Sequence, residues 1–185
     1  MLFGTENFEF GILNKLHDWL HCDFMDSLMV GISSLGNAGA VWIVIAIVMV
    51  SLKRYRKSGF VFAGALILGL IFGNLIMKNI IARPRPCELF EGIDMLIKIP
   101  SDPSFPSGHT LASFISAFVL FDVKRILGII AIVPAALMAL SRMYLFVHFP
   151  TDILGGIVLA LIIYFIVRSF LKRAEAEDYK KAVGE

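Results

Sequence analysis

Cysteine and histidine, the residues that most often bind metals or crosslink small folds, are scarce in this sequence. Its 185 residues include two cysteines, Cys22 and Cys87, and four histidines. No cluster of cysteine or carboxylate side chains has the spacing of metal ligands, so we predict that the chain binds no metal and no other cofactor. The two cysteines are either unrelated free thiols or, in a second interpretation, partners in a disulfide at the outer surface.

Charged residues are also few, and repeats and low-complexity tracts are absent. Charged side chains make up 17% of the chain, while hydrophobic residues make up 58%, compared with roughly 45–50% in soluble domains. The mean hydropathy is +0.81, and the apolar residues form runs of membrane-spanning length. These properties argue against a soluble protein and predict an all-α, polytopic transmembrane bundle in a single domain, residues 1–185.

Apolar runs and helical spacing indicate where the helices lie. Residues 7–20 place charged side chains between apolar ones at helical spacing, which predicts an interfacial helix within the N-terminal segment 1–22. Residues 23–35 are apolar but short, and favour an interfacial helix, a re-entrant segment or a thin span. We recognise no removable leader, so we expect the first spans to direct insertion. The remaining elements expected are spans at 41–52, 60–82, 107–122, 126–145 and 151–170, an outer loop at 83–106 and a charged tail at 171–185, which gives five or six membrane segments.

Basic residues at the ends of these spans predict the orientation in the membrane. The cluster from Lys53 to Lys57, the pair Lys124 and Arg125, and the charged tail share one side if four spans follow the first cluster. We expect this side to be cytoplasmic, and the chain to be a multi-pass protein of the plasma or inner membrane. The outer loop and the turn at His148 then face the outside or periplasm, whereas the N-terminus stays ambiguous.

Four basic residues contradict this orientation rule, because they lie at outer span ends or in outer loops: Lys78, Arg83, Arg85 and Arg142. Charged groups near hydrocarbon are costly, which marks these residues as functional candidates. One ammonium and two guanidinium groups suit a phosphoryl group, whose charge is spread over three oxygens during transfer. Arg83 is adjacent to this set, and it either contacts the substrate or belongs only to the loop.

A second segment suited to an anion begins the span at 107–122. Pro106 is a favourable first-turn residue, and the free backbone N–H groups at Ser107 and Gly108 form an anion site at a helix start. Gly108 also lets an oxygen approach the backbone closely. This pattern agrees with a phosphate ligand on the same membrane face as the four basic residues.

Two histidines and an aspartate could supply the chemistry. An imidazole can attack phosphorus if one ring nitrogen is unprotonated and the other is held, and Asp152 follows His148 by one helical turn. His109 could give a proton to the leaving group and later activate water. Each residue alone has an ordinary explanation, such as a snorkelling lysine or an interfacial histidine. Their joint placement on one face favours catalysis, without a metal.

Three motifs carry a family resemblance: Lys78-x6-Arg85-Pro86, Pro106-Ser107-Gly108-His109, and Ser141-Arg142-x5-His148-x3-Asp152. In order and spacing they resemble the signature of the type 2 phosphatidic acid phosphatase superfamily. The resemblance implies a phosphohistidine mechanism with His148 as nucleophile, Asp152 as its partner and His109 as acid. It also implies that phosphate is held by Lys78, Arg85, Ser107, Gly108 and Arg142.

The chain is also similar to small bacterial members of that superfamily in its length and its N-terminal helix. The function expected first is therefore hydrolysis of undecaprenyl diphosphate to undecaprenyl phosphate at the outer face. Phosphatidylglycerophosphate, phosphatidate or lipid A phosphatase activity is the alternative, and a membrane transporter or scaffold is the alternative from another class. The expected partners are a lipid phosphate and the bilayer, with no nucleic acid. The acidic residues of the outer loop either aid solubility or repel anionic head groups: Glu88, Glu91, Asp94 and Asp102.

Overall fold

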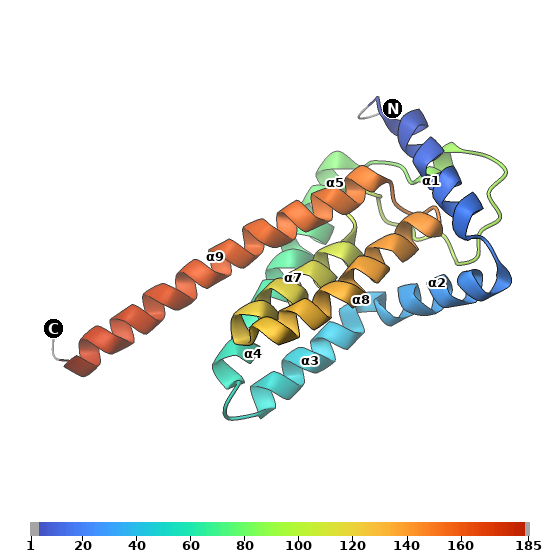
Figure 1. Ribbon diagram of the computed structural model, residues 1–185. Helices are drawn as coiled ribbons and strands as arrows, with labels where there is room; N and C mark the ends of the chain where they lie inside the picture. The colour runs from blue at the N-terminus through green and yellow to red at the C-terminus, as the bar shows by residue number, and fades with distance from the viewer. Residues whose placement is uncertain (1–3, 184–185) are drawn as a thin grey trace.

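The computed structural model describes residues 4–183, with side chains described up to residue 169. Every regular element in this part of the chain is helical, which confirms the all-α prediction (Figure 1). The expected tail at 171–185 lies outside the residues whose side chains are described. The elements are α1 (Glu6–Leu20), α2 (Asp23–Leu35), the 3-10 turn η1 (Asn37–Gly39), α3 (Ala40–Ser51), α4 (Arg56–Gly69), the π-helical η2 (Leu70–Met77), α5 (Lys78–Ile81), α6 (Pro86–Leu89), α7 (Gly108–Val123), α8 (Arg125–Tyr144) and α9 (Pro150–Val183).

Within the described residues, three helical stretches are long and apolar enough to cross a membrane: Arg56–Leu89, Arg125–Tyr144 and Pro150–Ser169. A fourth span forms if α2 is counted with the helix from Asn37 to Ser51, although the two are bent by 46° where they meet. The shorter apolar helix α7, at 16 residues, completes the bundle. The short segment 23–35 is thus the first arm of a bent pair, and the polytopic prediction is confirmed.

Helix α7 lies at the centre of the bundle, where it contacts α8, α9 and α4. It can be enclosed because small residues, such as Ser113, Ser116 and Ala117, alternate with the buried Leu111 and Ile115 along it. Small side chains let neighbouring helices approach closely inside a membrane. The N-terminal end of α7, which carries one of the three motifs, is therefore held firmly between other helices.

Glycines on the neighbouring helices permit this close approach, among them Gly69, Gly73, Gly155 and Gly156. A Cβ atom added at Gly73 would lie 2.3 Å from the Leu111 side chain. One added at Gly156 would lie 3.0 Å from the backbone oxygen of Ser107. A larger residue at Gly73 or Gly156 would therefore disturb the packing of the neighbouring helices against α7.

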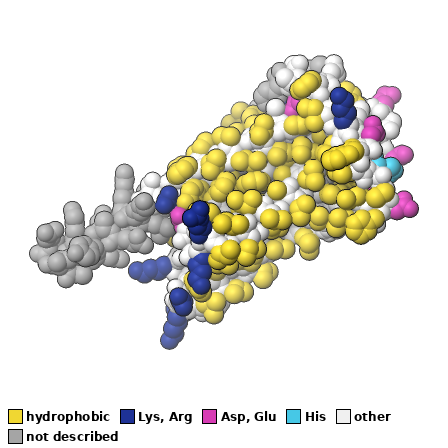
Figure 2. All heavy atoms as spheres, viewed as in Figure 1, with side chains coloured by type: hydrophobic (Ala, Val, Ile, Leu, Met, Phe, Trp, Pro, Cys, Tyr) yellow, Lys and Arg dark blue, Asp and Glu magenta, His cyan; other side chains and the backbone are white. Residues whose placement is uncertain are grey.

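The surface separates into an apolar band and two charged ends (Figure 2). Exposed large apolar side chains cover α3, α4, α8 and α9. Most exposed basic residues gather where α3 meets α4 and α7 meets α8, among them Lys53, Arg54, Arg56, Lys124 and Arg125. Lys15 and Lys98 are exposed at the opposite end. The opposite end carries the α1–α2 junction and the loop between α5 and α7, with exposed acidic side chains at Asp18, Asp23, Glu88, Glu91 and Asp94.

Helix α1 lies across this acidic end as an amphipathic helix. Phe8 and Trp19 point outward, with 74% and 83% of their surface exposed, whereas Glu6, Glu9 and Leu13 are buried against the bundle. The exposed apolar side chains suit a helix at the membrane interface, as predicted. The buried glutamates were not anticipated as contact residues.

Both cysteines are free thiols, with Cys22 exposed and Cys87 partly buried. The first interpretation of the two cysteines therefore applies, and the disulfide is not formed. The predicted outer loop also differs in one detail, because it contains the short helix α6. Pro86 begins this helix, and the Glu88 carboxylate accepts a hydrogen bond from the Arg85 backbone N–H at 2.7 Å.

Candidate active site

One cavity of about 950 Å³ brings together most of the residues that the motifs predicted. It lies at the acidic end of the bundle, where α5, α7 and α8 and the turn between α8 and α9 converge. Ser107 and Asp152 are fully buried behind its wall, and Pro106 and Arg83 also lie outside its lining. The predicted residues that line the cavity are Lys78, Arg85, Gly108, His109, Arg142 and His148.

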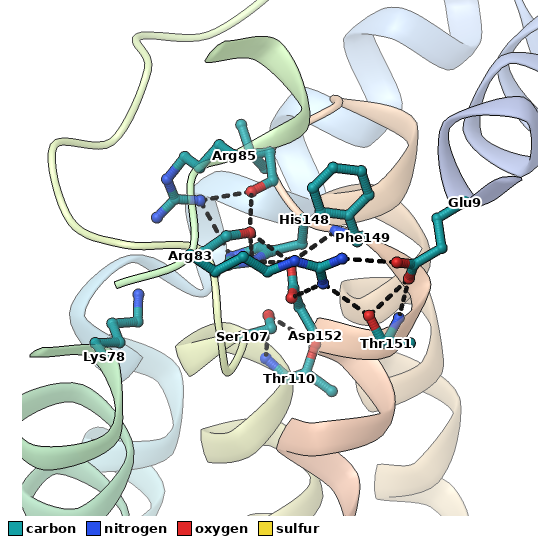
Figure 3. A network of polar contacts seen from close by, with 12 residues as sticks. Glu9, Lys78, Arg83, Arg85, Ser107, Thr110, His148, Phe149, Thr151 and Asp152 are labelled. Atoms are coloured by element: carbon teal, nitrogen blue, oxygen red, sulfur yellow. Dashed lines mark hydrogen bonds and ion pairs between the residues drawn. The ribbon is translucent and has the colours of Figure 1, made fainter. Parts of the chain in front are cut away.

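His148 lies in the tight turn between α8 and α9 and is 1% exposed. Its Nδ1 atom lies 3.3 Å from the Ser104 hydroxyl and 3.6 Å from an Asp152 carboxylate oxygen. Its Nε2 atom lies 3.3 Å from an Arg85 guanidinium nitrogen (Figure 3). Burial lowers the pKa of His148 to about 3, opposed by Asp152 and assisted by the Arg85 and Arg142 charges. The ring is therefore neutral at neutral pH, and Nδ1 is the nitrogen that faces acceptors.

Asp152 is fixed by three donors at the start of α9. One carboxylate oxygen accepts from the Phe149 backbone N–H at 2.8 Å and from the Ser104 hydroxyl. The other accepts from Arg83 at 2.6 Å. A carboxylate in the first helical turn that accepts from the N-cap N–H follows the logic of a capping box, and Pro150 supplies the first helical position. The sequence that begins α9 thus also orients the partner of His148.

Arg85 and Lys78 form the charged wall of the cavity. Arg85 donates to the Val147 carbonyl at 2.6 Å, to the Asp102 carbonyl at 2.9 Å and to the Asp102 carboxylate at 2.8 Å. Lys78 forms an ion pair with the same carboxylate. Burial alone would raise the pKa of Asp102, but Lys78 and Arg85 lower it to about 2. Interpreting Asp102 as a solubility or head-group-repelling residue was therefore incomplete, because its carboxylate bridges two predicted phosphate ligands.

Arg142 joins Lys78 and Arg85 as a third buried cation of the cavity, and these three residues are here named the cationic end. The exposed Lys98 also lines the cavity. Its guanidinium donates to the Ser33 hydroxyl of α2. Among the described residues, its Nε atom has no hydrogen-bond partner. Arg142 is 3% exposed, and it lines the cavity. The cationic end can therefore still bind an anion.

The start of α7 forms the floor of the cavity. The Ser107 hydroxyl caps the helix, accepting from the Thr110 N–H at 3.4 Å and the Thr110 hydroxyl at 3.0 Å. A Cβ at Gly108 would lie 2.7 Å from the Asn74 amide oxygen, so a larger residue there would require the Asn74 side chain to shift. His109 faces the cavity, and its Nε2 lies 3.3 Å from the Asn37 amide oxygen. The helix start and one histidine thus meet the cationic end. The Ser107 backbone N–H, which was expected to be free for an anion, instead donates to the Asp152 carbonyl at 3.1 Å.

Arg83 is completely buried behind His148 rather than in the cavity. It donates to Asp152 and to Glu9 at 2.6 Å each, and to the Thr151 hydroxyl at 2.7 Å. Its guanidinium also lies over the Phe149 ring, 4.1 Å from the ring centre. The structure therefore directs Arg83 toward protein groups. In the part of the chain that the structure describes, no three His, Cys, Asp or Glu side chains are grouped so as to hold a metal ion.

Comparison with known proteins identifies the family. A family model described as the PAP2 superfamily matches residues 57–175, which include all three motifs. The chain belongs to the PAP2 superfamily. The resemblance found in the motifs is thereby confirmed, and the protein is a PAP2 lipid phosphatase of a membrane.

Similar PAP2 proteins act on more than one lipid, according to their names. An undecaprenyl-diphosphatase of Sulfolobus acidocaldarius is 30% identical over 168 residues, covering 90% of this chain and 81% of that protein. Phosphatidylglycerophosphatase B of Bacillus subtilis is 34% identical over 163 residues, covering 80% and 75%. The crystal structure of a transmembrane PAP2 type phosphatidylglycerolphosphate phosphatase from Bacillus subtilis has a TM-score of 0.75 at 28% identity, covering 92% and 88% of the two chains.

In this PAP2 protein the cavity continues from the cationic end into an apolar passage between α3 and α4. The passage is lined mostly by aliphatic side chains, with small residues at Ala46 and Ala63. An amphiphile could place a charged head at one end and a hydrocarbon chain along the other. The residues that define the apolar passage are Ile43, Ala46, Ile47, Val50, Ala63, Leu66, Ile67 and Leu70.

The sequence did not predict the contacts that three residues make in this site: Ser104, Asp102 and Glu9. Ser104 touches both His148 and Asp152 from the loop before α7, but a loop serine carries no local signal. Asp102 lies among other acidic loop residues that do not reach the cavity. Glu9 had one detectable signal, because it lies one turn from the apolar Leu13 on the face of α1 that the bundle buries. A charged residue on a buried face is unusual unless it is paired.

Proposed function

We propose that this protein is a phosphohistidine-forming lipid phosphatase that converts undecaprenyl diphosphate to undecaprenyl phosphate and inorganic phosphate. One observation supports it above the others. His148 presents Nε2 beside a cationic end that continues into an apolar passage, while Ser104 and Asp152 hold Nδ1. That arrangement suits an imidazole nucleophile acting on the charged head of a lipid.

In the first step, the cationic end and the backbone N–H of Gly108 at the start of α7 bind the terminal phosphoryl group. His148 Nε2 attacks phosphorus, and the bond from phosphorus to the bridging oxygen breaks. His109 gives a proton to the departing lipid phosphate. The positive charge on the phosphorylated imidazole is stabilised by Asp152, which Phe149 and Ser104 hold in place.

In the second step, His109 takes a proton from a water molecule, and the resulting hydroxide attacks phosphorus. The phosphorus–nitrogen bond to His148 breaks, and inorganic phosphate leaves. Each charge formed in the two steps is met by a side chain of the protein, so the proposed reaction uses no metal. Ser107 serves this cycle by fixing the start of α7, and its backbone N–H donates to the Asp152 carbonyl at 3.1 Å.

The proposed site faces the outside or periplasm. Most exposed basic residues gather at the end of the bundle opposite the cavity, which is the end that the orientation rule assigns to the cytoplasm. We further propose one domain over residues 1–185, with an interfacial segment at 1–22, an outer loop at 83–106 that supplies part of the site, and a cytoplasmic tail at 171–185.

A second candidate substrate is phosphatidylglycerophosphate. It is favoured by the names of one similar sequence and of the solved structure with the same fold. Phosphatidate and lipid A phosphate would engage the same cationic end. The head groups differ only beyond the phosphate that the site binds, so a direct comparison of substrates is required.

A substrate panel tests the proposal. Purified protein in detergent is given undecaprenyl diphosphate, phosphatidylglycerophosphate, phosphatidate and a lipid A phosphate, and phosphate release is measured with and without excess EDTA. We expect undecaprenyl diphosphate to have the highest kcat/KM, with less than about a twofold effect of EDTA. A higher kcat/KM for a glycerophospholipid would assign the second candidate, and a loss restored only by Mg²⁺ would overturn the metal-free scheme. No phosphate release from any lipid would favour a transporter or scaffold.

A further inference from the structure

A chain of buried ion pairs links the carboxylate behind His148 to the N-terminal helix (Figure 3). Arg83 donates through one guanidinium nitrogen to Asp152 and through the other to Glu9, at 2.6 Å in both cases. The Arg83 and Asp152 side chains are fully buried, and the Glu9 side chain is 4% exposed. Charges so removed from water are rarely kept unless they are paired. The pairing here joins α1 to the start of α9.

Glu9 is held as firmly as Arg83. One of its oxygens accepts from the Thr151 backbone N–H at 2.8 Å and from the Thr151 hydroxyl at 2.6 Å. The other accepts from Arg83 and from the Thr5 hydroxyl at 2.8 Å. Burial alone would raise the pKa of Glu9, but these hydrogen bonds lower it below its ordinary value. Glu9 is therefore an ionised carboxylate. Its partner Thr151 directly precedes Asp152, the carboxylate that faces His148.

The charges in this chain do not cancel. One guanidinium lies between two carboxylates, so a net negative charge remains on the side that faces the His148 Nδ1 atom. If Glu9 were uncharged, Arg83 would belong to Asp152 alone, and that carboxylate would stabilise an imidazolium less well. Because Arg83 pairs with Glu9 as well as with Asp152, the negative charge of Asp152 is only partly neutralised and can stabilise a His148 imidazolium. Neither Glu9 nor Arg83 lines the cavity.

We propose that Glu9 and Arg83 are positioning residues for hydrolysis, through which α1 holds Asp152 and thereby orients His148. The inference rests on the proposed role of His148 as nucleophile. It assigns to the N-terminal helix a part in the reaction besides its place at the membrane interface. Because the effect passes through Asp152, it concerns turnover and not phosphate binding, which the cationic end performs.

The test compares Glu9→Gln with Asp18→Asn, which removes the same charge from an exposed position on the same helix. For Glu9→Gln we expect kcat to fall on the order of tenfold, as for other residues that orient a reactive group. KM and inhibition by inorganic phosphate should stay within about twofold of wild type. Asp18→Asn should match wild type in all three. A fall in Tm with unchanged kcat per folded molecule would mean that Glu9 is only structural, and would overturn the inference.

A double variant tests whether Glu9 affects turnover through Asp152 or independently of it. If Glu9 acts through Asp152, adding Glu9→Gln to Asp152→Asn should lower the residual kcat by less than about twofold. A full second loss would overturn the inference. Should Glu9→Gln yield no folded protein, Glu9→Asp retains the charge but moves it away from Arg83. Glu9→Asp should then show a smaller fall in kcat at constant KM, and wild-type kcat in that variant would also overturn the inference.

The same assays distinguish this inference from the proposed function. If His148→Ala retains turnover, the nucleophile assignment is wrong and the inference fails with it. If His148→Ala and Asp152→Asn lose turnover while Glu9→Gln and Arg83→Lys equal wild type, the proposed function stands and only the inference fails. Arg83→Lys keeps the charge without a second donor arm, so we expect its kcat to lie between wild type and Arg83→Ala.

Discussion

The two nitrogens of the His148 ring have opposite surroundings. Nδ1 faces the Ser104 hydroxyl and the Asp152 carboxylate, whereas Nε2 faces Arg85 and the cavity. A ring with one nitrogen beside a carboxylate and the other beside a cation has a defined tautomer, because the proton is favoured on the nitrogen beside the carboxylate. The lone pair then points to where a phosphate would be held.

Replacing His148 should remove turnover with little effect on the fold. We expect His148→Ala to lower kcat by at least about a thousandfold, because His148 forms the covalent intermediate in the proposed reaction. His148→Gln, which keeps polar atoms in the buried turn, serves as a control for packing. Phosphate release and thermal unfolding measured on the same preparations check this, and substantial residual activity would contradict the nucleophile assignment.

Asp102 should compete with substrate phosphate, because its carboxylate already bridges Lys78 and Arg85. We expect Asp102→Asn to strengthen inhibition by inorganic phosphate about threefold. Weaker inhibition would mean that Asp102 instead holds the two cations in place.

The pH dependence of that effect follows from the sign of the pKa shift. The folded-state pKa of Asp102, about 2, lies below its ordinary value of 3.8, so its contribution to stability is present above that value and is lost as the pH falls toward 2. The carboxylate is therefore charged from about pH 5 to pH 9. The ratio of phosphate inhibition constants between Asp102→Asn and wild type should be the same at both ends of that range.

At the scale of elements, the contact between α7 and α9 brings two motifs together. The Ser107 backbone N–H donates to the Asp152 carbonyl, and Gly156, one turn further along α9, lies against Ser107. The first turns of α7 and α9 are thus in direct contact, and Gly156 allows this close approach. The helix start and the carboxylate partner are held in register by this packing.

A methyl group at Gly156 should disturb this contact. In Gly156→Ala the new Cβ would lie 3.0 Å from a backbone oxygen, and such overpacking costs about 1–3 kcal/mol. We expect a lower Tm in detergent and a reduced kcat. Gly64→Ala is the matched control, because a Cβ at Gly64 on α4 meets nothing within 4 Å and alanine favours a helix. Equal Tm values for the two variants would contradict the packing argument.

The elements themselves were largely predictable, because each span shows its apolar run locally. The expected span at 126–145 corresponds to α8 (Arg125–Tyr144), and that at 107–122 to α7 (Gly108–Val123). The bend of 46° after α2 was not predictable from the sequence. The π-helical turn Leu70–Met77 left no sign in the sequence, since its apolar residues equally suit an α-helix.

The site was predictable only where its residues recur in motifs. Lys78, Arg85, His109, Arg142 and His148 meet in one cavity as the motifs indicated. Glu9 and Ser104 were missed because their partners are 74 and 44 or more positions away, and no local pattern encodes such contacts. Pairing between charged or polar residues that are distant in the sequence can be recognised only once the packing of the helices is known.

The whole molecule is polar at its two ends and apolar between them. The end with the cavity carries acidic side chains and α1, and the other carries the basic clusters (Figure 2). A lipid phosphate can then keep its head at the polar end while its chain follows the apolar passage within the apolar band. The orientation of the molecule decides which leaflet is served.

Cys22 offers a natural reporter of that orientation, because it is exposed at the junction of α1 and α2 on the side of the cavity. In intact cells producing a Cys87→Ser variant, a membrane-impermeant maleimide should label Cys22. Lys53→Cys in a variant lacking both native cysteines should be labelled only after the cells are opened. The reverse pattern would place the cavity on the cytoplasmic side.

The contacts of Glu9 also have a consequence for biosynthesis. The ribosome makes Glu9 before Arg83, which follows 74 positions later, and before Thr151, which follows 142 positions later. The nascent chain therefore contains α2 to α8 before α1 can make its contacts with the start of α9. Hydrolytic competence would arise only after Thr151 has been made, and a fusion that hinders α1 would yield an inserted but idle protein.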